Sequence, residues 1–197
     1  WPTPRSVREV RSFVGLCSYY RKFVRDFAEI ASPLHALTKE GRSFIWSDEC
    51  QVSFDRLKLA LTSPPVLAMP TDDGTYLLDT DASLHSMGAV LSQIQDGTER
   101  VIAYASRCFS HQEMNYCVTR RELLAVVTFA RYFRQYVLGR PFVIRTDHSA
   151  LQWLQKTPQP IGQQARWLEI LQEFNFTIEH RPGTRHGNAD SLSRRPE

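Results

Sequence analysis

The stretch TYLLDTDASLHSMGAVL, from Thr75 to Leu91, has the composition of two short β-strands joined by a turn, yet its first apolar run contains two carboxylates. Asp79 and Asp81 are two residues apart, so both side chains face the same side of a strand. Burying an unpaired carboxylate costs several kcal/mol or forces the group to take up a proton. A cation, a set of hydrogen-bond donors or exposure at the strand end must therefore offset this cost.

The runs that follow predict the rest of an α/β fold. RVIAYASR (100–107) comes after QDGTE, which predicts an antiparallel meander of three strands. Apolar residues at helical spacing predict a long helix from Val118 to about Leu138, closed by Gly139. Further strands are expected at 141–147 and 175–180, and further helices at 148–155, 164–174 and 187–194. This order predicts a mixed five-stranded sheet flanked by helices.

The N-terminal third has a different pattern, without any alternation typical of strands. Its apolar residues keep helical spacing in three segments, namely Val10 to Cys17, Phe27 to Lys39, and a segment that begins at Ser47 and contains Cys50, Phe54, Leu57 and Leu61. The sequence therefore predicts two regions, a small all-helical region at 1–66 and an α/β domain at 67–197.

Composition narrows the possible functions. The net charge of the 197 residues is only +3, so nucleic-acid binding would depend on local patches rather than on a polycationic surface. No apolar run reaches membrane-spanning length, so we expect no membrane association. The four cysteines lack CxxC spacing, which indicates free thiols in a reducing compartment rather than a zinc site. The chain begins at Trp1 without an initiator Met, and we expect it to be part of a longer protein.

Four acidic residues stand at predicted element ends, Asp81 among them, and each has a structural explanation when taken alone. Asp81 could bind turn amides near Ser83. Glu122 could form a capping box with Thr119. Asp147 could cap the helix that follows it, and Asp190 could interact favourably with the dipole of a short helix.

Taken together, the four acidic residues favour a metal site. If the fourth strand lies beside the first, Asp81 and Asp147 meet at the same edge of the sheet. Glu122 can reach that edge from the start of the long helix, and Asp190 can reach it from the last helix. Carboxylates that converge in this way need a counter-charge, and Mg²⁺ binds few carboxylates together with waters and phosphate oxygens.

A family resemblance agrees with this pattern. The segments TDAS…GAVL, NYCVTRRELLAVV, FVIRTDHSALQWL and RPGTRHGNADSLSR occur in that order. In this the chain resembles the ribonuclease H domain of gypsy-type LTR-retrotransposon reverse transcriptases. Residues 1–39 and 46–70 are similar to the thumb and connecting segment of the same Pol polyproteins. The resemblance spans essentially the whole chain and implies a ribonuclease H-like fold behind a helical thumb/connection region.

By motif position, the resemblance implies that Asp81, Glu122, Asp147 and Asp190 are the catalytic, metal-binding quartet. Asp81 would bridge two Mg²⁺ ions, with Mn²⁺ as a possible substitute, at a separation of about 3.5–4 Å. Asp190 would help to hold the ion that activates water, and Glu122 and Asp147 the ion that stabilises the departing 3′ oxygen. The implied reaction is hydrolysis of the RNA strand of an RNA/DNA hybrid, leaving 5′-phosphate and 3′-hydroxyl ends.

Other residues have secondary roles in this interpretation. His180 matches a position where retroviral relatives keep a histidine that assists metal departure and proton transfer, whereas His186 is expected to be a surface loop residue. Asp79 is expected to be a solvated or hydrogen-bonded neighbour of the site. Hybrid recognition in the wide minor groove uses backbone amides and short polar side chains. The candidates that flank the carboxylates are Ser83, the backbone at Gly88, Asn115 and Thr119.

The expected partners are an RNA/DNA hybrid, the fingers and palm of the reverse transcriptase, and other Pol domains. The chain carries no polymerase signature of its own, because Asp72 and Asp73 stand in the turn sequence PTDDGT. We expect an intracellular location, in cytoplasmic particles or the nucleus. The competing hypothesis is a non-catalytic nucleic-acid clamp or protein-interaction module derived from a retroelement. The intact quartet favours the enzyme.

Overall fold

The structure is a computed structural model that describes residues 1–39, 43–151, 162–182 and 187–194. The chain divides into two compact units, Trp1–Met69 and Pro70–Arg194. Within the described ranges, every helix is too short or too polar to cross a lipid bilayer.

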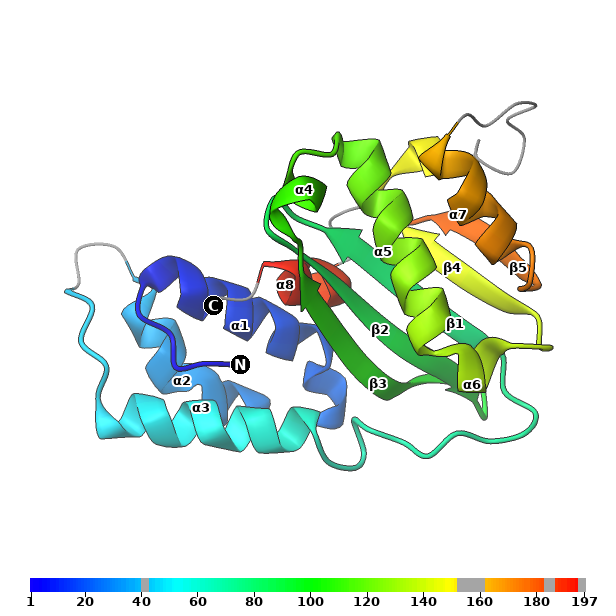
Figure 1. Ribbon diagram of the computed structural model, residues 1–197. Coiled ribbons are helices and arrows are strands. Elements are labelled where there is room, and N and C mark those ends of the chain that lie inside the picture. The colour runs from blue at the N-terminus through cyan, green and yellow to red at the C-terminus, as the bar shows by residue number, and fades with distance from the viewer. Residues whose placement is uncertain (40–42, 152–161, 183–186, 195–197) are drawn as a thin grey trace. The chain divides into compact units, whose positions relative to one another are not determined.

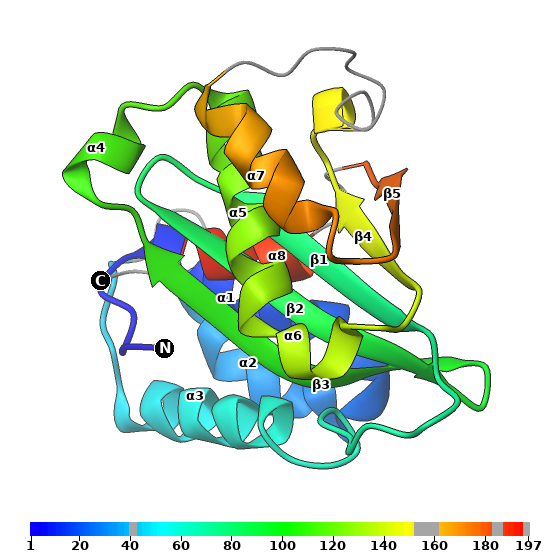
Figure 2. The ribbon, with the colours of Figure 1, turned by 45° about the vertical axis from the view of Figure 1, so that its right-hand side comes forward.

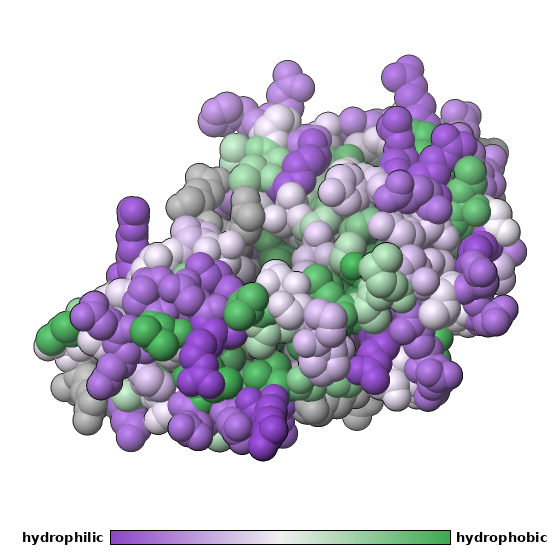
Figure 3. Space-filling model, turned by 90° about the horizontal axis from the view of Figure 1, so that it is seen from below, coloured by the Kyte–Doolittle hydropathy of each residue, from purple (hydrophilic) through white to green (hydrophobic). Residues whose placement is uncertain are grey.

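The first unit is helical, as its sequence pattern predicts. Its elements are α1 (Val7–Tyr19), the 3-10 turn η1 (Arg21–Phe23), α2 (Phe27–Leu37) and α3 (Asp48–Leu61). The side chains of Ser6 and Ser47 cap α1 and α3 by accepting backbone N–H groups. The rings of Phe13 and Phe54 lie with their centroids 4.6 Å apart and are both buried. The surface seen from below in Figure 3 has hydrophobic side chains interspersed with hydrophilic ones.

The second unit is built on a mixed five-stranded sheet (Figure 1). Its strands are β1 (Tyr76–Ala82), β2 (Ser86–Gln95), β3 (Thr98–Cys108), β4 (Phe142–Thr146) and β5 (Phe176–His180). The spatial order is β3-β2-β1-β4-β5. The first three strands form an antiparallel meander, and β4 is parallel to both β1 and β5. The predicted α/β class is confirmed, and β4 lies beside β1 as the convergence of Asp81 and Asp147 requires.

Helices cover both faces of this sheet. They are α4 (His111–Met114), α5 (Val118–Tyr132), α6 (Arg134–Val137), α7 (Gln163–Leu171) and α8 (Gly187–Ser193). Figures 1 and 2 show α5 and α7 on one face and α8 on the other. The main core fills the α5 side, where Leu78, Leu91 and Ile144 of the sheet meet Leu123 of α5 and Trp167 of α7. Because side chains alternate along a strand, Asp79 and Asp81 face away from this core.

The helix predicted from Val118 to Leu138 is divided in the structure. Phe133 has φ −92° and ψ 16°, which interrupts the helical hydrogen bonds between α5 and α6. Phe133 and Val137 are nonetheless buried like the preceding apolar residues, so the apolar spacing continues past the break. Gly139 has φ 76°, a left-handed conformation that glycine tolerates. The short helix α4 was not predicted, and the second half of the helix expected at 148–155 lies outside the described residues.

Candidate active site

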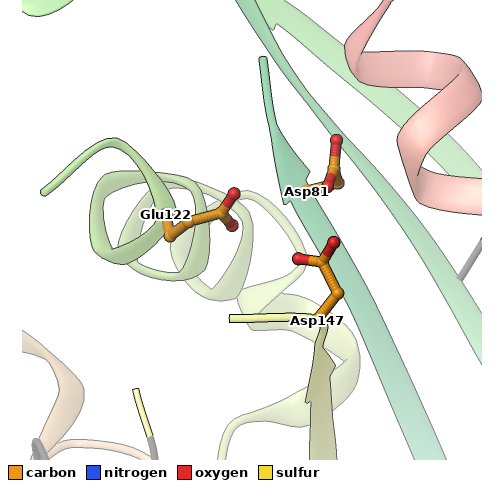
Figure 4. A group of neighbouring side chains, drawn as sticks. All are labelled: Asp81, Glu122 and Asp147. Atoms are coloured by element: carbon orange, nitrogen blue, oxygen red, sulfur yellow. The ribbon is translucent and has the colours of Figure 1, made fainter. Parts of the chain in front are cut away.

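Three carboxylates meet at the edge of the sheet where β1 and β4 end. Asp81 stands near the end of β1, Asp147 directly follows β4, and Glu122 projects toward both from α5 (Figure 4). One carboxylate oxygen of each residue lies within 4.8 Å of those of the other two. This proximity follows from the topology, because the carboxyl ends of two neighbouring parallel strands reach the same edge.

Glu122 is buried in this group and is only partly satisfied. Its Oε1 accepts a hydrogen bond from the backbone N–H of Ala82 at 3.2 Å, whereas Oε2 is buried without a hydrogen-bond partner. Burial, followed by the charges of Asp81 and Asp147, raises the pKa of the Glu122 carboxyl to about 9. The capping-box explanation is wrong, because α5 begins after Cys117 and Thr119 does not cap it. The hydroxyl of Thr119 instead lies 3.0 Å from Nε2 of His148.

The turn after β1 leaves Asp81 available to the site. The amides of His85 and Ser86 donate to the hydroxyl of Ser83, at 3.2 and 3.0 Å. Ser83 thus fills the turn-binding role that Asp81 could have had. The carboxylate of Asp81, 4% exposed, accepts a hydrogen bond through Oδ2 from Oγ of Ser193 in α8. The sequence pattern did not single out Ser193, because its partner lies 112 positions away along the chain.

Asp147 is the exposed member of the group. The hydroxyl of Thr146, rather than Asp147, accepts the backbone N–H of His148, at 3.1 Å. Nε2 of His180 lies 3.0 Å from the carbonyl oxygen of Asp147. His180 is therefore adjacent to the acidic group, although its contact is with backbone rather than with a carboxylate.

Asp190 does not join the three clustered carboxylates. Its Oδ1 pairs with Nε of Arg194 at 2.6 Å, one turn further along the chain. Its carbonyl oxygen lies 2.9 Å from Oγ of Ser193, the residue that contacts Asp81. The backbone of α8 therefore reaches the site while the Asp190 carboxylate faces Arg194, and a metal-binding role for Asp190 stays a prediction.

Asp79 is fully buried, so the part of the prediction that left it solvated is wrong and the hydrogen-bonded alternative holds. Nε and Nη2 of Arg145 donate to its two oxygens at 2.7 and 2.5 Å. Nδ2 of Asn188 donates to Oδ2 at 2.8 Å, and Nη1 of Arg181 lies 3.4 Å from Oδ1. These donors supply the counter-charge that a buried carboxylate needs, so Asp79 is structural rather than a ligand.

The four substrate-binding candidates lie in different settings. The hydroxyl of Ser83 is engaged in the β1–β2 turn, and Gly88 is buried against the end of α8. Asn115 is exposed at the end of α4, with Nδ2 donating to the carbonyl of His111 at 3.1 Å. Thr119 is half-buried beside His148. Asn115 is therefore the most exposed of the candidates, whereas the side chains of Ser83 and Thr119 are both half-buried. His186 lies outside the described residues.

The donor set of the acidic group suits a divalent cation. Three carboxylates in mutual proximity repel one another when ionised, and oxygen ligands are those preferred by Mg²⁺ and Mn²⁺. The orphaned Oε2 of Glu122 is a second observation that points to a missing partner. The four cysteines are free of disulfide bonds, in agreement with the prediction of free thiols. They are Cys17, Cys50, Cys108 and Cys117.

Comparisons with known proteins agree with the architecture. The family model described as the RNase H-like domain found in reverse transcriptase matches residues 71–174. The chain is 38% identical over 194 residues to the retrovirus-related Pol polyprotein from transposon 412 of Drosophila melanogaster, covering 98% of this chain and 16% of that polyprotein. It is thus similar to a small part of a much longer protein.

Solved structures of a foamy viral protease-reverse transcriptase are also similar. The complex with double-stranded DNA has a TM-score of 0.70 and 26% identity, covering 91% of this chain and 40% of that one. The complex with an RNA/DNA hybrid has a TM-score of 0.51 and 25% identity, covering 91% and 25%. With more than half of its residues matched by the family model, this chain belongs to the RNase H-like domains found in reverse transcriptase.

Proposed function

We propose that this chain is a Mg²⁺-dependent endonuclease that hydrolyses the RNA strand of RNA/DNA hybrids, as part of a retrotransposon Pol polyprotein. The observation that carries the proposal is the group of Asp81, Glu122 and Asp147, with its buried, unpartnered Glu122 oxygen. Family membership and the hybrid complex of a similar enzyme support the choice of substrate.

The residues of the site have complementary roles in this proposal. Asp81 and Asp147 supply two carboxylates at the sheet edge, and Glu122 supplies a third from α5. A bound divalent cation would neutralise phosphate charge and lower the pKa of a coordinated water. Glu122 would release its proton when the cation binds, because carboxylate ligands bind metals in their ionised form. Asp190 would complete the ligand set, and His180 would assist proton transfer next to Asp147.

The partners follow from the same assignment. The hybrid would be held beside the exposed Asp147, with Asn115 and Thr119 at its border. The chain spans about a sixth of the polyproteins it matches, so we infer that fingers, palm and other Pol domains surround it in the complete protein. An intracellular location, in particles or the nucleus, stays a prediction.

Cleavage of an RNA/DNA hybrid labelled on its RNA strand tests the proposal. The 197-residue chain should cut the RNA in the presence of Mg²⁺ and not in the presence of EDTA. Asp81→Asn should reduce the rate at least about 100-fold, since each 1.36 kcal/mol lost from transition-state stabilisation is a factor of ten. Asp96→Asn is the matched control, because Asp96 is exposed in the β2–β3 turn and Asn tolerates its φ of 50°.

Two results would contradict the nuclease proposal. One is cleavage that Asp81→Asn leaves unchanged. The other is hybrid binding by the unmodified chain without any cleavage, which would support the non-catalytic clamp instead.

A further inference from the structure

We propose that Ser193 is a positioning residue of the metal site, whose hydroxyl orients the carboxylate of Asp81 toward a divalent cation. The inference rests on the proposed function, because both require a metal ion at Asp81. Ser193 is fully buried at the end of α8, and its Oγ donates to Oδ2 of Asp81. This contact connects the C-terminal helix directly to the acidic group.

A donor on one oxygen of a carboxylate restricts the rotation of the whole group. Residues that hold metal ligands in this way typically contribute 10–100-fold to metal affinity or activity. Oδ2 of Asp81 receives such a donor from a side chain that is itself immobilised. The backbone carbonyl of Ser193 accepts a hydrogen bond from Oγ of Ser86 at 2.5 Å, which fixes the end of α8 to the start of β2.

Gly88 makes the approach of Ser193 possible. Gly88 is the direct partner of Asp81 across the β1–β2 pair. A Cβ added at Gly88 would lie 2.6 Å from the backbone nitrogen of Ser193 and 2.7 Å from the carbonyl carbon of Leu192. Any side chain there would displace the end of α8 from Asp81. The absence of a side chain at Gly88 therefore allows the Ser193 hydroxyl to reach Asp81.

The hydroxyl also connects Asp81 with a second predicted ligand residue. Oγ of Ser193 lies 2.9 Å from the carbonyl oxygen of Asp190. A serine within a helix commonly bonds a carbonyl one turn back, as Ser191 does with Gly187 at 2.7 Å. Ser193 differs because its hydroxyl also contacts a carboxylate on another element, that of Asp81 in β1. Ser191 thus provides a matched control on the same helix.

Binding of Mn²⁺ to the full 197-residue chain, measured by isothermal titration calorimetry, tests the inference without reference to catalysis. Ser193→Ala should weaken Mn²⁺ binding about 10-fold or more, the effect expected for a residue that orients a metal ligand. Ser191→Ala removes the same hydroxyl from the same helix and should leave the affinity unchanged. Circular dichroism of each variant establishes that α8 and the sheet are intact.

Unchanged Mn²⁺ affinity in folded Ser193→Ala would overturn the inference. If that variant does not fold, Ser193→Cys replaces it, since a thiol has a similar size but is a weak donor. A folded Ser193→Cys variant should also bind Mn²⁺ less tightly, and wild-type affinity would again overturn the inference. Hybrid cleavage by the unmodified chain is scored separately. Mn²⁺ binding without cleavage would thus contradict the proposed nuclease and still decide the role of Ser193.

Discussion

The energetic cost of bringing three carboxylates together falls most heavily on Glu122. Burial and the neighbouring charges raise its pKa from 4.5 to about 9, so in the metal-free protein the folded state holds a proton that the unfolded state has released. The free energy of unfolding therefore falls as pH rises between these two values, by at most about 1.4 kcal/mol per pH unit. A cation would remove this penalty by compensating the ionised form.

Glu122→Gln should abolish this pH dependence, because glutamine is neutral and close in shape to the protonated acid. In EDTA, the variant should gain between about 1 and 4 kcal/mol of unfolding free energy relative to the wild type as pH rises from about 5.5 to 8.5. Urea unfolding across this range measures the difference, with Asp96→Asn as the exposed control. A difference between variant and wild type that does not change with pH would contradict the assignment.

Asp79 and Asp81 show why residue roles were only partly predictable. They share a strand and a face, and the sequence indicated that both needed compensation. The compensating partners of Asp79 are Arg145 and Asn188, 66 and 109 positions away, and nothing local marks them. Asp81 was correctly placed beside Asp147 because strand order alone decides that proximity. Asp190 shows the limit of this reasoning, because the rotamer of a half-buried helical side chain does not follow from element order.

At the scale of elements, Arg145 connects three strands of the sheet. It donates to Asp79 of β1 and, through Nη1 and Nη2, to Glu99 of β3 at 3.1 and 2.6 Å. Burial alone would lower the pKa of Arg145, but the hydrogen bonds with Glu99 and the charge of Asp79 outweigh burial and raise it. Asn188 extends the network from Asp79 to α8. The network thus holds β1, β3, β4 and α8 around one guanidinium group.

Removing this guanidinium should destabilise the second unit strongly. Arg145→Met leaves Asp79 buried with much of its counter-charge gone, which typically costs about 3–5 kcal/mol of unfolding free energy. Arg107→Met provides the contrast, since Arg107 is 43% exposed in its pair with Glu113 and should cost less than about 1 kcal/mol. Urea unfolding compares the two variants. Equal losses would show that the buried network contributes no more than a surface pair.

Element prediction succeeded where the apolar pattern and the backbone agree. The three antiparallel strands follow directly from periodicity and turn residues, and so does α3, which begins next to Ser47 as predicted. The break at Phe133 was missed because residues on both sides of it bury the same face. The four-residue helix α4 is too short to show a period. Its capping box of Ser110 and Glu113 was the available signal.

For the whole molecule, the division into two units bears on which part of the chain would carry the proposed activity. The buried cluster between the sheet, α5 and α7 is formed by residues between Tyr76 and Phe174. Asp81, Glu122, Asp147, Asp190 and Ser193 all lie in the unit Pro70–Arg194. The family model ends at residue 174, before α8, although α8 supplies the hydrogen bond to Asp81. The C-terminal helix must therefore be kept in any shortened chain.

A chain shortened to residues 70–197 should fold and retain the metal-dependent cleavage proposed above, because it keeps its own core and every acidic residue of the site. Cooperative thermal unfolding and hybrid cleavage measure the two properties, with Asp81→Asn in the same shortened chain as the control.

A second truncation, ending at residue 182, removes α8 and with it the contacts of Ser193 and Asn188. It should lose Mn²⁺ affinity by at least the 10-fold or so expected for Ser193→Ala. Mn²⁺ affinity equal to that of the wild type in the chain without α8 would show that this helix contributes nothing to the site. Non-cooperative unfolding of the chain 70–197 would show that the second unit depends on the first for its stability.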